Sequence, residues 1–299
     1  MTTDQSIVLE IDELMSTINT TVDKEFVDLL EFSSPYSRPE LYKAIADEIR
    51  KDNIEQVNRI SEQVKPKSSI YSKYIKRLLD IIISLIALII TFPFNFIIFI
   101  ITIFDVGFPI FFKQKRIGRN GKPFKLVKFR NMRNDCDENG NLLPASKRVT
   151  KFGRFIRRTS LDELLNFWSI FKGDMSLIGP RPLELVYSQR YSKRHEQRNA
   201  VRPGLECPII KTLDHNLTWC DQFENDIYYV ENVSFGLDVK MIFLLVKMVF
   251  NSKSNSMRGA SARGGFLGYN PDGTSINAKN VPAKYVERAL EKLSQKKAG

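Results

Sequence analysis

The sequence predicts a mainly α-helical monotopic membrane protein with a small β element, one proline-bent re-entrant helix and interfacial amphipathic helices. An apolar run spans residues 81–104, Pro93 interrupts it near its middle, and basic residues cluster on both flanks. As one continuous helix the run would extend about 36 Å, enough to cross a bilayer. Proline breaks a helix, and the positive-inside tendency would place both ends in the cytoplasm. We therefore expect a helix of about residues 78–104 that bends at Pro93 and leaves the leaflet it entered. A kinked spanning helix is the alternative.

The bulk composition is that of a folded protein with an anionic partner. The chain has 299 residues, is 43% apolar and carries a net charge of +11. Its three cysteines show no zinc-type spacing, and their odd number argues against a disulfide framework. The positive charge would suit nucleic acid, acidic lipid or a nucleotide substrate, and charge alone does not choose among them.

Residues 1–70 form an acidic extension to the basic remainder of the chain. They contain 14 acidic and 8 basic side chains and three amphipathic helical patterns, with no signal peptide. We expect a small helical N-terminal extension that either packs on the main domain or binds a partner.

The segment after the apolar run predicts a hairpin and an interfacial helix. Apolar and basic residues alternate around Asn120-Gly121, which places Lys128 and Arg130 on the returning strand. That face would bind phosphate groups or rest on anionic lipid head groups. Residues 147–158 then read as a basic amphipathic helix in the membrane interface. A nucleic-acid-binding helix would have the same pattern, but no DNA- or RNA-binding module accompanies it.

The stretch from Arg157 to Pro182, RRTSLDELLNFWSIFKGDMSLIGPRP, organises the rest of the chain. Its apolar residues recur at helical spacing after Ser160, so Asp162 and Glu163 would occupy the first turn of a helix. Ser160-x-x-Glu163 also fits a capping box, which is the purely structural interpretation of these carboxylates. The Gly-Pro-Arg-Pro turn can bring Arg181 back toward them.

The C-terminal third carries fewer signals. His195 and His215 lack a partner at metal spacing, so we expect exposed or structural histidines. Residues 224–250 end in a short apolar stretch that suits an interfacial or core helix. Residues 251–299 are predicted to be a C-terminal flexible loop followed by a solvated basic helical tail.

Three separate motifs together resemble one family. SLDELLNFWSIFKGDMSLIGPRPLE, the upstream KQKRIGRNGKPFKLVKFRNM and the downstream VRPGL occur in this order. They closely resemble the bacterial sugar transferase family, the monotopic polyprenyl-phosphate phosphoglycosyl transferases, over about residues 74–250. The resemblance implies a membrane-associated catalytic core at residues 71–250, with a re-entrant helix bent at proline.

The resemblance also implies a reaction and a place. Such enzymes move a sugar 1-phosphate from a UDP-sugar to polyprenyl (undecaprenyl) phosphate and release UMP, on the cytoplasmic face of the bacterial inner membrane. This is the first membrane step of exopolysaccharide, capsule, O-antigen or glycoprotein glycan synthesis. Inner-leaflet anionic lipids are expected partners and nucleic acid is not; association with further copies or with downstream glycosyltransferases stays open.

Carried over by motif, Asp162 is the nucleophile that forms a covalent phosphosugar intermediate. Glu163 would bind Mg²⁺ or act electrostatically, and Asp238 in GLDVK matches a further acid near the metal. Four basic residues are candidate phosphate contacts, and paired or lipid-facing charge is the alternative for each. They are Arg157, Arg181, Lys128 and Arg130.

One departure bears on the sugar. After RPGL the family often has a glycine-tryptophan segment ending in Asn-Gly-Arg-Asn, whereas this chain reads ECPIIKTLDHN, with Asp214 where the arginine would fall. We expect a changed sugar preference. Two other classes of function remain: a catalytically altered membrane adaptor, and a direct sugar transferase that releases UDP.

Overall fold

The computed structural model describes residues 38–138, 140, 142–143, 145–211, 213–250 and 263–298. This part of the chain is mainly helical and carries three two-stranded sheets, which confirms the predicted balance of α and β structure. The helical patterns predicted within residues 1–37, and most of the loop predicted to begin at residue 251, lie outside the described residues.

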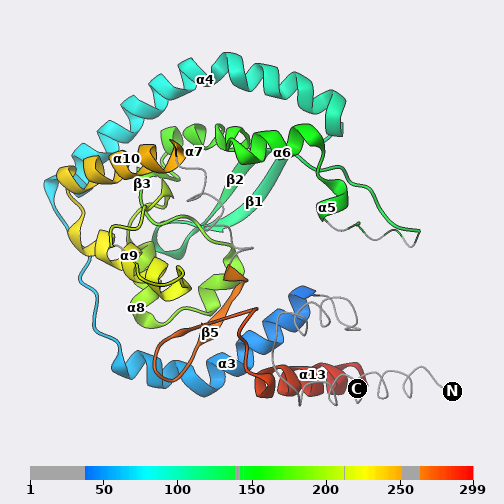
Figure 1. Ribbon diagram of the computed structural model, residues 1–299. Helices are drawn as coiled ribbons and strands as arrows, with labels where there is room; N and C mark the ends of the chain where they lie inside the picture. The colour runs from blue at the N-terminus through cyan, green and yellow to red at the C-terminus, as the bar shows by residue number, and fades with distance from the viewer. Residues whose placement is uncertain are drawn as a thin grey trace.

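One long apolar helix covers the molecule. A π-helical turn, η1 (Tyr71–Ile75), runs directly into α4 (Lys76–Val106). Together they are long and apolar enough to cross a membrane by length and composition, and little of their apolar surface is buried. Pro93 lies inside α4, and Figure 1 shows the helix arching over the rest of the chain.

Both halves of α4 pack against the same body. Near its start, the buried Asp80 accepts hydrogen bonds from Ser176 Oγ and the Leu177 N–H, both at 3.0 Å. Near its end, Asp105 Oδ2 accepts a hydrogen bond of 2.5 Å from Thr150 Oγ1. The outward face of the helix keeps large apolar side chains exposed, which is the arrangement expected of a helix solvated by lipid.

The predicted hairpin is confirmed. Strands β1 (Phe111–Ile117) and β2 (Pro123–Phe129) pair antiparallel through a short turn, η2 (Arg119–Gly121). Asn120 and Gly121 both have positive φ, 55° and 73°, as a tight turn built on Asn-Gly requires.

The helix predicted at residues 147–158 is divided in two. A short helix, α5 (Ala145–Arg148), is followed by a bridge between Met132 and Val149, and α6 (Lys151–Arg158) then starts afresh. Thr150 is the N-cap of α6, since its side chain accepts a hydrogen bond from the Gly153 N–H. The extended backbone of a capping residue ends the preceding helix, which is why one amphipathic pattern gives two helices.

The remaining core elements follow α6 in short steps. They are η3 (Leu161–Glu163), α7 (Asn166–Lys172), β3 (Ser176–Ile178), η4 (Leu185–Gln189), α8 (Lys193–Glu196), η5 (Gln197–Ala200), β4 (Gly204–Glu206), α9 (Trp219–Asn232) and α10 (Phe235–Phe250). Strands β3 and β4 are parallel, and Gly179, just after β3, packs against Gly204 in β4. A Cβ on Gly204 would lie 2.2 Å from Gly179 N, so this close approach requires glycine.

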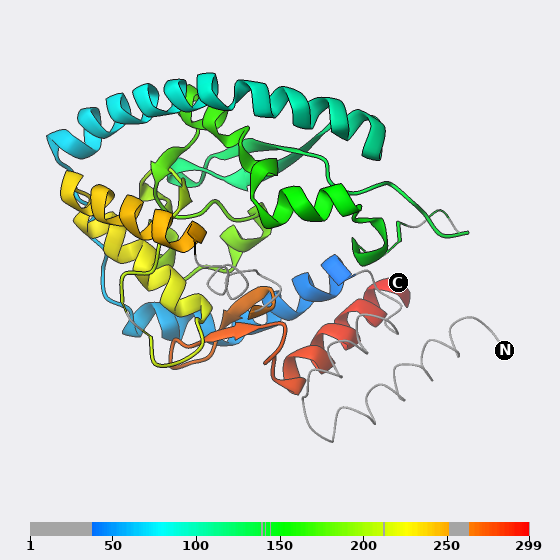
Figure 2. The same cartoon turned by 45° about the horizontal axis from the view of Figure 1, so that its top comes forward.

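The two ends of the described chain form a second cluster opposite α4. Helix α3 (Arg38–Ile60) packs against α13 (Ala283–Ala298) and the hairpin of β5 (Phe266–Tyr269) and β6 (Ser275–Asn277). Figures 1 and 2 show these elements on the side away from α4. The expectation of a solvated basic tail is wrong for α13, because Val286 and Leu290 are fully buried against α3. The division of the chain near residues 70 and 250 stays a prediction.

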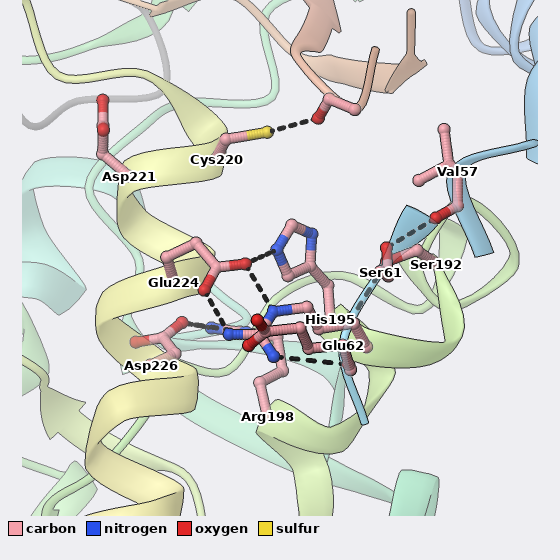
Figure 3. Close-up of polar contacts among 12 residues, drawn as sticks. Val57, Ser61, Glu62, Ser192, His195, Arg198, Cys220, Asp221, Glu224 and Asp226 are labelled. Atoms are coloured by element: carbon pink, nitrogen blue, oxygen red, sulfur yellow. Dashed lines mark hydrogen bonds and ion pairs between the residues drawn. The ribbon is translucent and has the colours of Figure 1, made fainter. Parts of the chain in front are cut away.

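A buried polar network joins this cluster to the core. A ring nitrogen of His195 lies 2.8 Å from Glu224 Oε1 (Figure 3). The other ring nitrogen lies 2.8 Å from Tyr269 Oη, and Arg194 pairs with the same glutamate at 2.6 Å. Beside it, the fully buried Asp226 accepts from Arg198 at 2.6 Å. Of the two outcomes predicted for His195, exposed or structural, the structure shows the second.

Candidate active site

Asp162 and Glu163 lie on a single 3₁₀ turn, η3, and not in the first turn of an α-helix. Ser160 adopts a left-handed backbone conformation (φ 57°, ψ 20°) and makes no capping hydrogen bond with its side chain. The predicted helix start and capping box at Ser160 are therefore wrong, and α7 begins only at Asn166. The physical reason is that left-handed geometry takes the chain off the helical path, while the carboxylate of Glu163 has stronger partners elsewhere.

Those partners are two cations from different elements. Lys128 Nζ on β2 lies 2.5 Å from Glu163 Oε1, and Arg181 Nη2 lies 2.9 Å from the same oxygen. Burial by itself would raise the pKa of Glu163, but the charges of Arg181 and Lys128 outweigh it and lower that pKa to about 2. Glu163 is thus a permanently charged carboxylate held by cations.

Asp162 is the buried member of the pair, with 6% of its surface exposed. Asn131 Nδ2, just beyond β2, donates to Asp162 Oδ2 at 3.1 Å. Burial raises the pKa of Asp162, Lys128 and Arg157 act against that rise, and the neighbouring charge of Glu163 adds to it. Arg157 acts here through its charge, because no described hydrogen bond or ion pair joins it to either carboxylate. A poorly hydrated carboxylate of this kind is a stronger nucleophile than one in water.

Arg181 connects Glu163 to strand β4. Its Nη1 donates to the Leu205 carbonyl at 3.0 Å and lies 3.4 Å from Glu206 Oε2, while Nη2 pairs with Glu163. The charge of Glu163 raises the pKa of Arg181, and Glu206 adds to this effect. Arg181 and Lys128 therefore both lie beside the dyad, and a phosphate contact for either stays a prediction.

Two other predicted site residues lie elsewhere. Arg130 donates to the Phe108 carbonyl at 3.1 Å and also to the Val106 carbonyl, so it caps the end of α4. Among the described contacts, none joins it to Asp162 or Glu163. A phosphate contact for Arg130 stays a prediction.

Asp238 is likewise fully engaged away from the dyad. Its Oδ2 accepts from Lys76 at 2.7 Å and from Tyr71 at 2.5 Å, and its Oδ1 accepts from Tyr229 at 2.7 Å. No hydrogen bond or ion pair in the described chain links it to the dyad. A role for Asp238 near a metal ion stays a prediction.

Sequence reasoning missed the residues that position the Asp162 side chain. Asn131 directly follows the KFR motif, yet only the fold shows that its side chain reaches Asp162. Gly153 on α6 lies so close to Asn131 that an added Cβ would be 2.1 Å from the Asn131 carbonyl oxygen. The backbone of α6 thus packs directly on the residue whose side chain donates to Asp162.

The donor set of the dyad fits a hard divalent cation shared with a substrate. The described residues contain no group of three or more His, Cys, Asp or Glu side chains suited to hold a metal ion. Asp162 and Glu163 supply two adjacent carboxylates, and Mg²⁺ commonly uses one or two carboxylates together with substrate phosphates and water. Glu163 could therefore contribute a ligand to such an ion together with a phosphorylated substrate, beside Asp162.

The loop that departs from the expected motif lies at the surface. The Asp214 side chain is 99% exposed, and its Oδ1 is 2.7 Å from Nδ1 of His215. His215 also bonds to Asp221, which forms a capping box with Thr218 at the start of α9. None of these contacts reaches the dyad.

The sequence of residues 71–252 matches the bacterial sugar transferase family. The uncharacterized sugar transferase EpsL of Bacillus subtilis is 45% identical over 148 residues, which are 50% of this chain and 73% of EpsL. The galactosyl transferase CpsE of Streptococcus agalactiae is 36% identical over 157 residues, 48% of this chain and 35% of CpsE. A UDP-glucose:undecaprenyl-phosphate glucose-1-phosphate transferase of Klebsiella pneumoniae is 34% identical over 196 residues, 60% of this chain and 41% of that protein. The chain thus spans most of EpsL and less than half of the other two.

Proposed function

The chain belongs to the bacterial sugar transferase family, as its motifs predicted, and from this membership we propose that it transfers a sugar 1-phosphate from a UDP-sugar to undecaprenyl phosphate. The names of several relatives, including the Klebsiella pneumoniae protein, support this enzyme class and both substrates. The product would be the lipid-linked sugar that starts an exopolysaccharide or a related surface glycan.

The observation that carries the proposal is the position of Asp162. It is a buried carboxylate beside a second carboxylate, and Lys128 and Arg181 hold that second group. An adaptor protein has no need for two adjacent acids in such a setting, since burying a carboxylate opposes folding unless it serves another purpose.

The reaction would proceed in two displacements. An oxygen of Asp162 attacks the phosphorus nearest the sugar, the bond from that phosphorus to the bridging anhydride oxygen breaks, and UMP leaves with that oxygen. The phosphate oxygen of the lipid then attacks the same phosphorus and releases Asp162. Asn131 holds Oδ2 of Asp162, which leaves Oδ1 to act as the nucleophile.

The charged neighbours would make this attack by an anion on an anion feasible. Lys128 and Arg181 would offset the negative charge on the transferred phosphate, and they would need no rearrangement because Glu163 already fixes them. Mg²⁺, held by Glu163 together with the substrate phosphates, would supply further charge neutralisation when bound. Arg157 is expected to contact the departing nucleotide or the lipid phosphate.

The arrangement of α4 supports a re-entrant helix at the cytoplasmic face of the bacterial inner membrane. A spanning helix would place its two ends on opposite sides of the bilayer, about 30 Å apart. Here Asp80 near the start and Asp105 near the end both bind the same body. A helix bent at Pro93 that stays in one leaflet is compatible with both contacts.

The test is nucleotide release by the full chain in nanodiscs, with Mg²⁺, undecaprenyl phosphate and a panel of UDP-sugars. We expect UMP from the wild type and none from Asp162→Ala. Asp214→Arg, assayed with the same panel, examines the sugar preference. Release of UDP in place of UMP would identify a direct sugar transferase, and release of neither by a folded, membrane-bound protein would favour the adaptor.

A further inference from the structure

Two arginines from separate elements meet at the C-terminal end of α7, and a third lies close to one of them. Arg77 lies in the first turn of α4, Arg119 in the turn of the β1–β2 hairpin, and Arg202 just before β4. Gly173, the residue directly after α7, is a common neighbour of Arg77 and Arg202. Arg202 Nε donates to the Gly173 carbonyl at 3.2 Å, and Arg77 packs against Gly173 so closely that a Cβ there would lie 3.1 Å from Arg77 Nη2.

Most of the donors in this arginine cluster remain unused. Arg77 is satisfied, because it donates to the carbonyls of Ile170 and Phe171 at 2.7 and 2.8 Å. Arg202 makes only the bond to Gly173, and Arg119 makes only one, from Nε to the Ala200 carbonyl at 3.4 Å. Within the described chain, the terminal nitrogens of Arg119 and Arg202 have no hydrogen-bond partner and none of the three arginines has a carboxylate in an ion pair.

This accumulation of charge is unfavourable without an anion. Burial lowers the pKa of Arg202, and the charges of Arg119 and Arg77 lower it further. The partial negative charge at the end of α7 accounts for Arg77, which caps that end, but it offers nothing to the outer nitrogens of Arg119 and Arg202. Paired guanidinium groups are the usual partners of a phosphate, since each can donate two parallel hydrogen bonds.

The cluster lies where a membrane lipid would present a phosphate. Arg77 precedes Leu78, an exposed apolar residue with which the outward face of α4 begins, so the Arg77 side of the cluster is at the level of the head groups. Helix α7 packs beneath α4, and its half-exposed Trp168 is of the type that lies in a membrane interface. Figures 1 and 2 both show α7 on the α4 side of the molecule.

The cluster is separate from the proposed catalytic dyad. The dyad precedes α7 and the cluster follows it, and a helix of seven residues is about 10 Å long. We propose that Arg77, Arg119 and Arg202 form a binding site for the phosphodiester head group of an anionic phospholipid. The site holds the α4 end of the protein at a fixed depth in the membrane, and it takes no part in the transfer reaction.

The test measures bound lipid without any substrate. The full chain is placed in nanodiscs of phosphatidylcholine with about one tenth phosphatidylglycerol, released gently into detergent, and its retained lipids are counted by native mass spectrometry. The variant Arg119→Gln/Arg202→Gln removes both unpaired cations and keeps Arg77 with its hydrogen bonds to the last carbonyls of α7. The matched control Lys51→Gln/Arg59→Gln removes the same charge from exposed positions on α3, away from α4.

We expect the wild type and the control to retain phosphatidylglycerol far above its share of the bilayer. Loss of two cations should weaken that retention about 30-fold. Arg119→Lys/Arg202→Lys keeps the charge and loses the paired donors, so it should retain an intermediate amount. Equal enrichment in the glutamine variant and the wild type would overturn the proposal.

An activity assay distinguishes a phospholipid site from a site for the acceptor, undecaprenyl phosphate. In the glutamine variant, the KM for undecaprenyl phosphate should stay within about twofold of the wild type at a fixed lipid composition. A large rise in that KM with unchanged phosphatidylglycerol retention would assign the cluster to the acceptor phosphate and overturn the proposal. Asp162→Ala should retain phosphatidylglycerol like the wild type, so failure of the proposed catalytic function would leave this result unaffected.

Discussion

Gly153→Ala tests whether the close approach of α6 to Asn131 controls the candidate nucleophile. In an ordinary helix interior this substitution raises stability by roughly 1 kcal/mol, because alanine has the higher helix propensity. Here the new Cβ would lie 2.1 Å from the Asn131 carbonyl oxygen and 2.9 Å from Thr150 Oγ1. Ordinary contact begins at 3.4 Å, so α6 and the Asn131 segment must separate by 3.4 − 2.1 = 1.3 Å.

That displacement decides whether Gly153→Ala raises or lowers stability, and by how much. Overpacking of this kind lowers the free energy of unfolding by about 1–3 kcal/mol, which exceeds the gain in helix propensity. The hydrogen bond from Asn131 to Asp162 is already 3.1 Å long, so a further separation of this size breaks it. A misplacement of about 1 Å can lower a rate about 100-fold. We expect Gly153→Ala to lower kcat for UMP release about 100-fold while the protein still folds.

The assay pairs UMP release in nanodiscs with urea unfolding, and Gly236→Ala is the control. Gly236 is also in a helix, α10, but a Cβ there would meet no atom within 4 Å. This variant should be at least as stable as the wild type and equally active. If Gly153→Ala keeps both the wild-type unfolding free energy and the wild-type kcat, the reasoning that links α6, Asn131 and Asp162 is refuted.

Three further predictions concern the same site and its support. Asn131→Ala should lower kcat at least tenfold with little change in the KM for the UDP-sugar, because a hydrogen bond to a carboxylate is worth about 1.5–3 kcal/mol. A rise in that KM with kcat unchanged would point to substrate binding instead. Ser160→Val should lower the unfolding free energy by about 1–2 kcal/mol and Ser160→Gly should not, since only the first strains a left-handed residue; equal urea midpoints would contradict this. Although burial raises the pKa of Glu224, Arg194 and His195 bring it down from 4.5 to about 2. The ionised Glu224 thus stabilises the fold above about pH 4.5 and loses this effect as the pH falls toward 2. The contribution to the unfolding free energy should be less than about 1 kcal/mol, because the side chain is 45% exposed. Glu224→Gln should remove this pH dependence from urea unfolding.

Local patterns in the sequence predicted the elements that local forces determine. The apolar run of residues 81–104 gave the position of α4, and Asn120-Gly121 gave the turn between β1 and β2. Both depend on neighbours in the chain, through hydrophobic burial in one case and permitted backbone angles in the other. The surface that buries α13 comes from α3, more than 200 residues away, and no local pattern contains that information.

The helix expected at Ser160 failed for a related reason. In a capping box the carboxylate of Glu163 would accept a hydrogen bond from the Ser160 N–H, but distant cations compete for the same carboxylate. Lys128 and Arg181 are 35 and 18 residues away, and two charged contacts are worth more than one capping hydrogen bond. Once the carboxylate turns to these cations, the backbone at Ser160 is free to take the left-handed form that presents Asp162.

The different positions of Lys128 and Arg130 show where residue spacing stops being informative. Two residues apart in one strand, they should project from the same face and reach the same substrate. Strand β2 ends at Phe129, however, so the alternation holds for Lys128 and fails for Arg130. The guanidinium of Arg130 instead caps the last carbonyls of α4, and this contact ties the membrane helix to the segment that carries Asn131. The KFRN sequence thus joins a cation at the dyad, an anchor for the end of α4 and a hydrogen bond to Asp162 within four residues, so one short segment connects α4 to the candidate nucleophile.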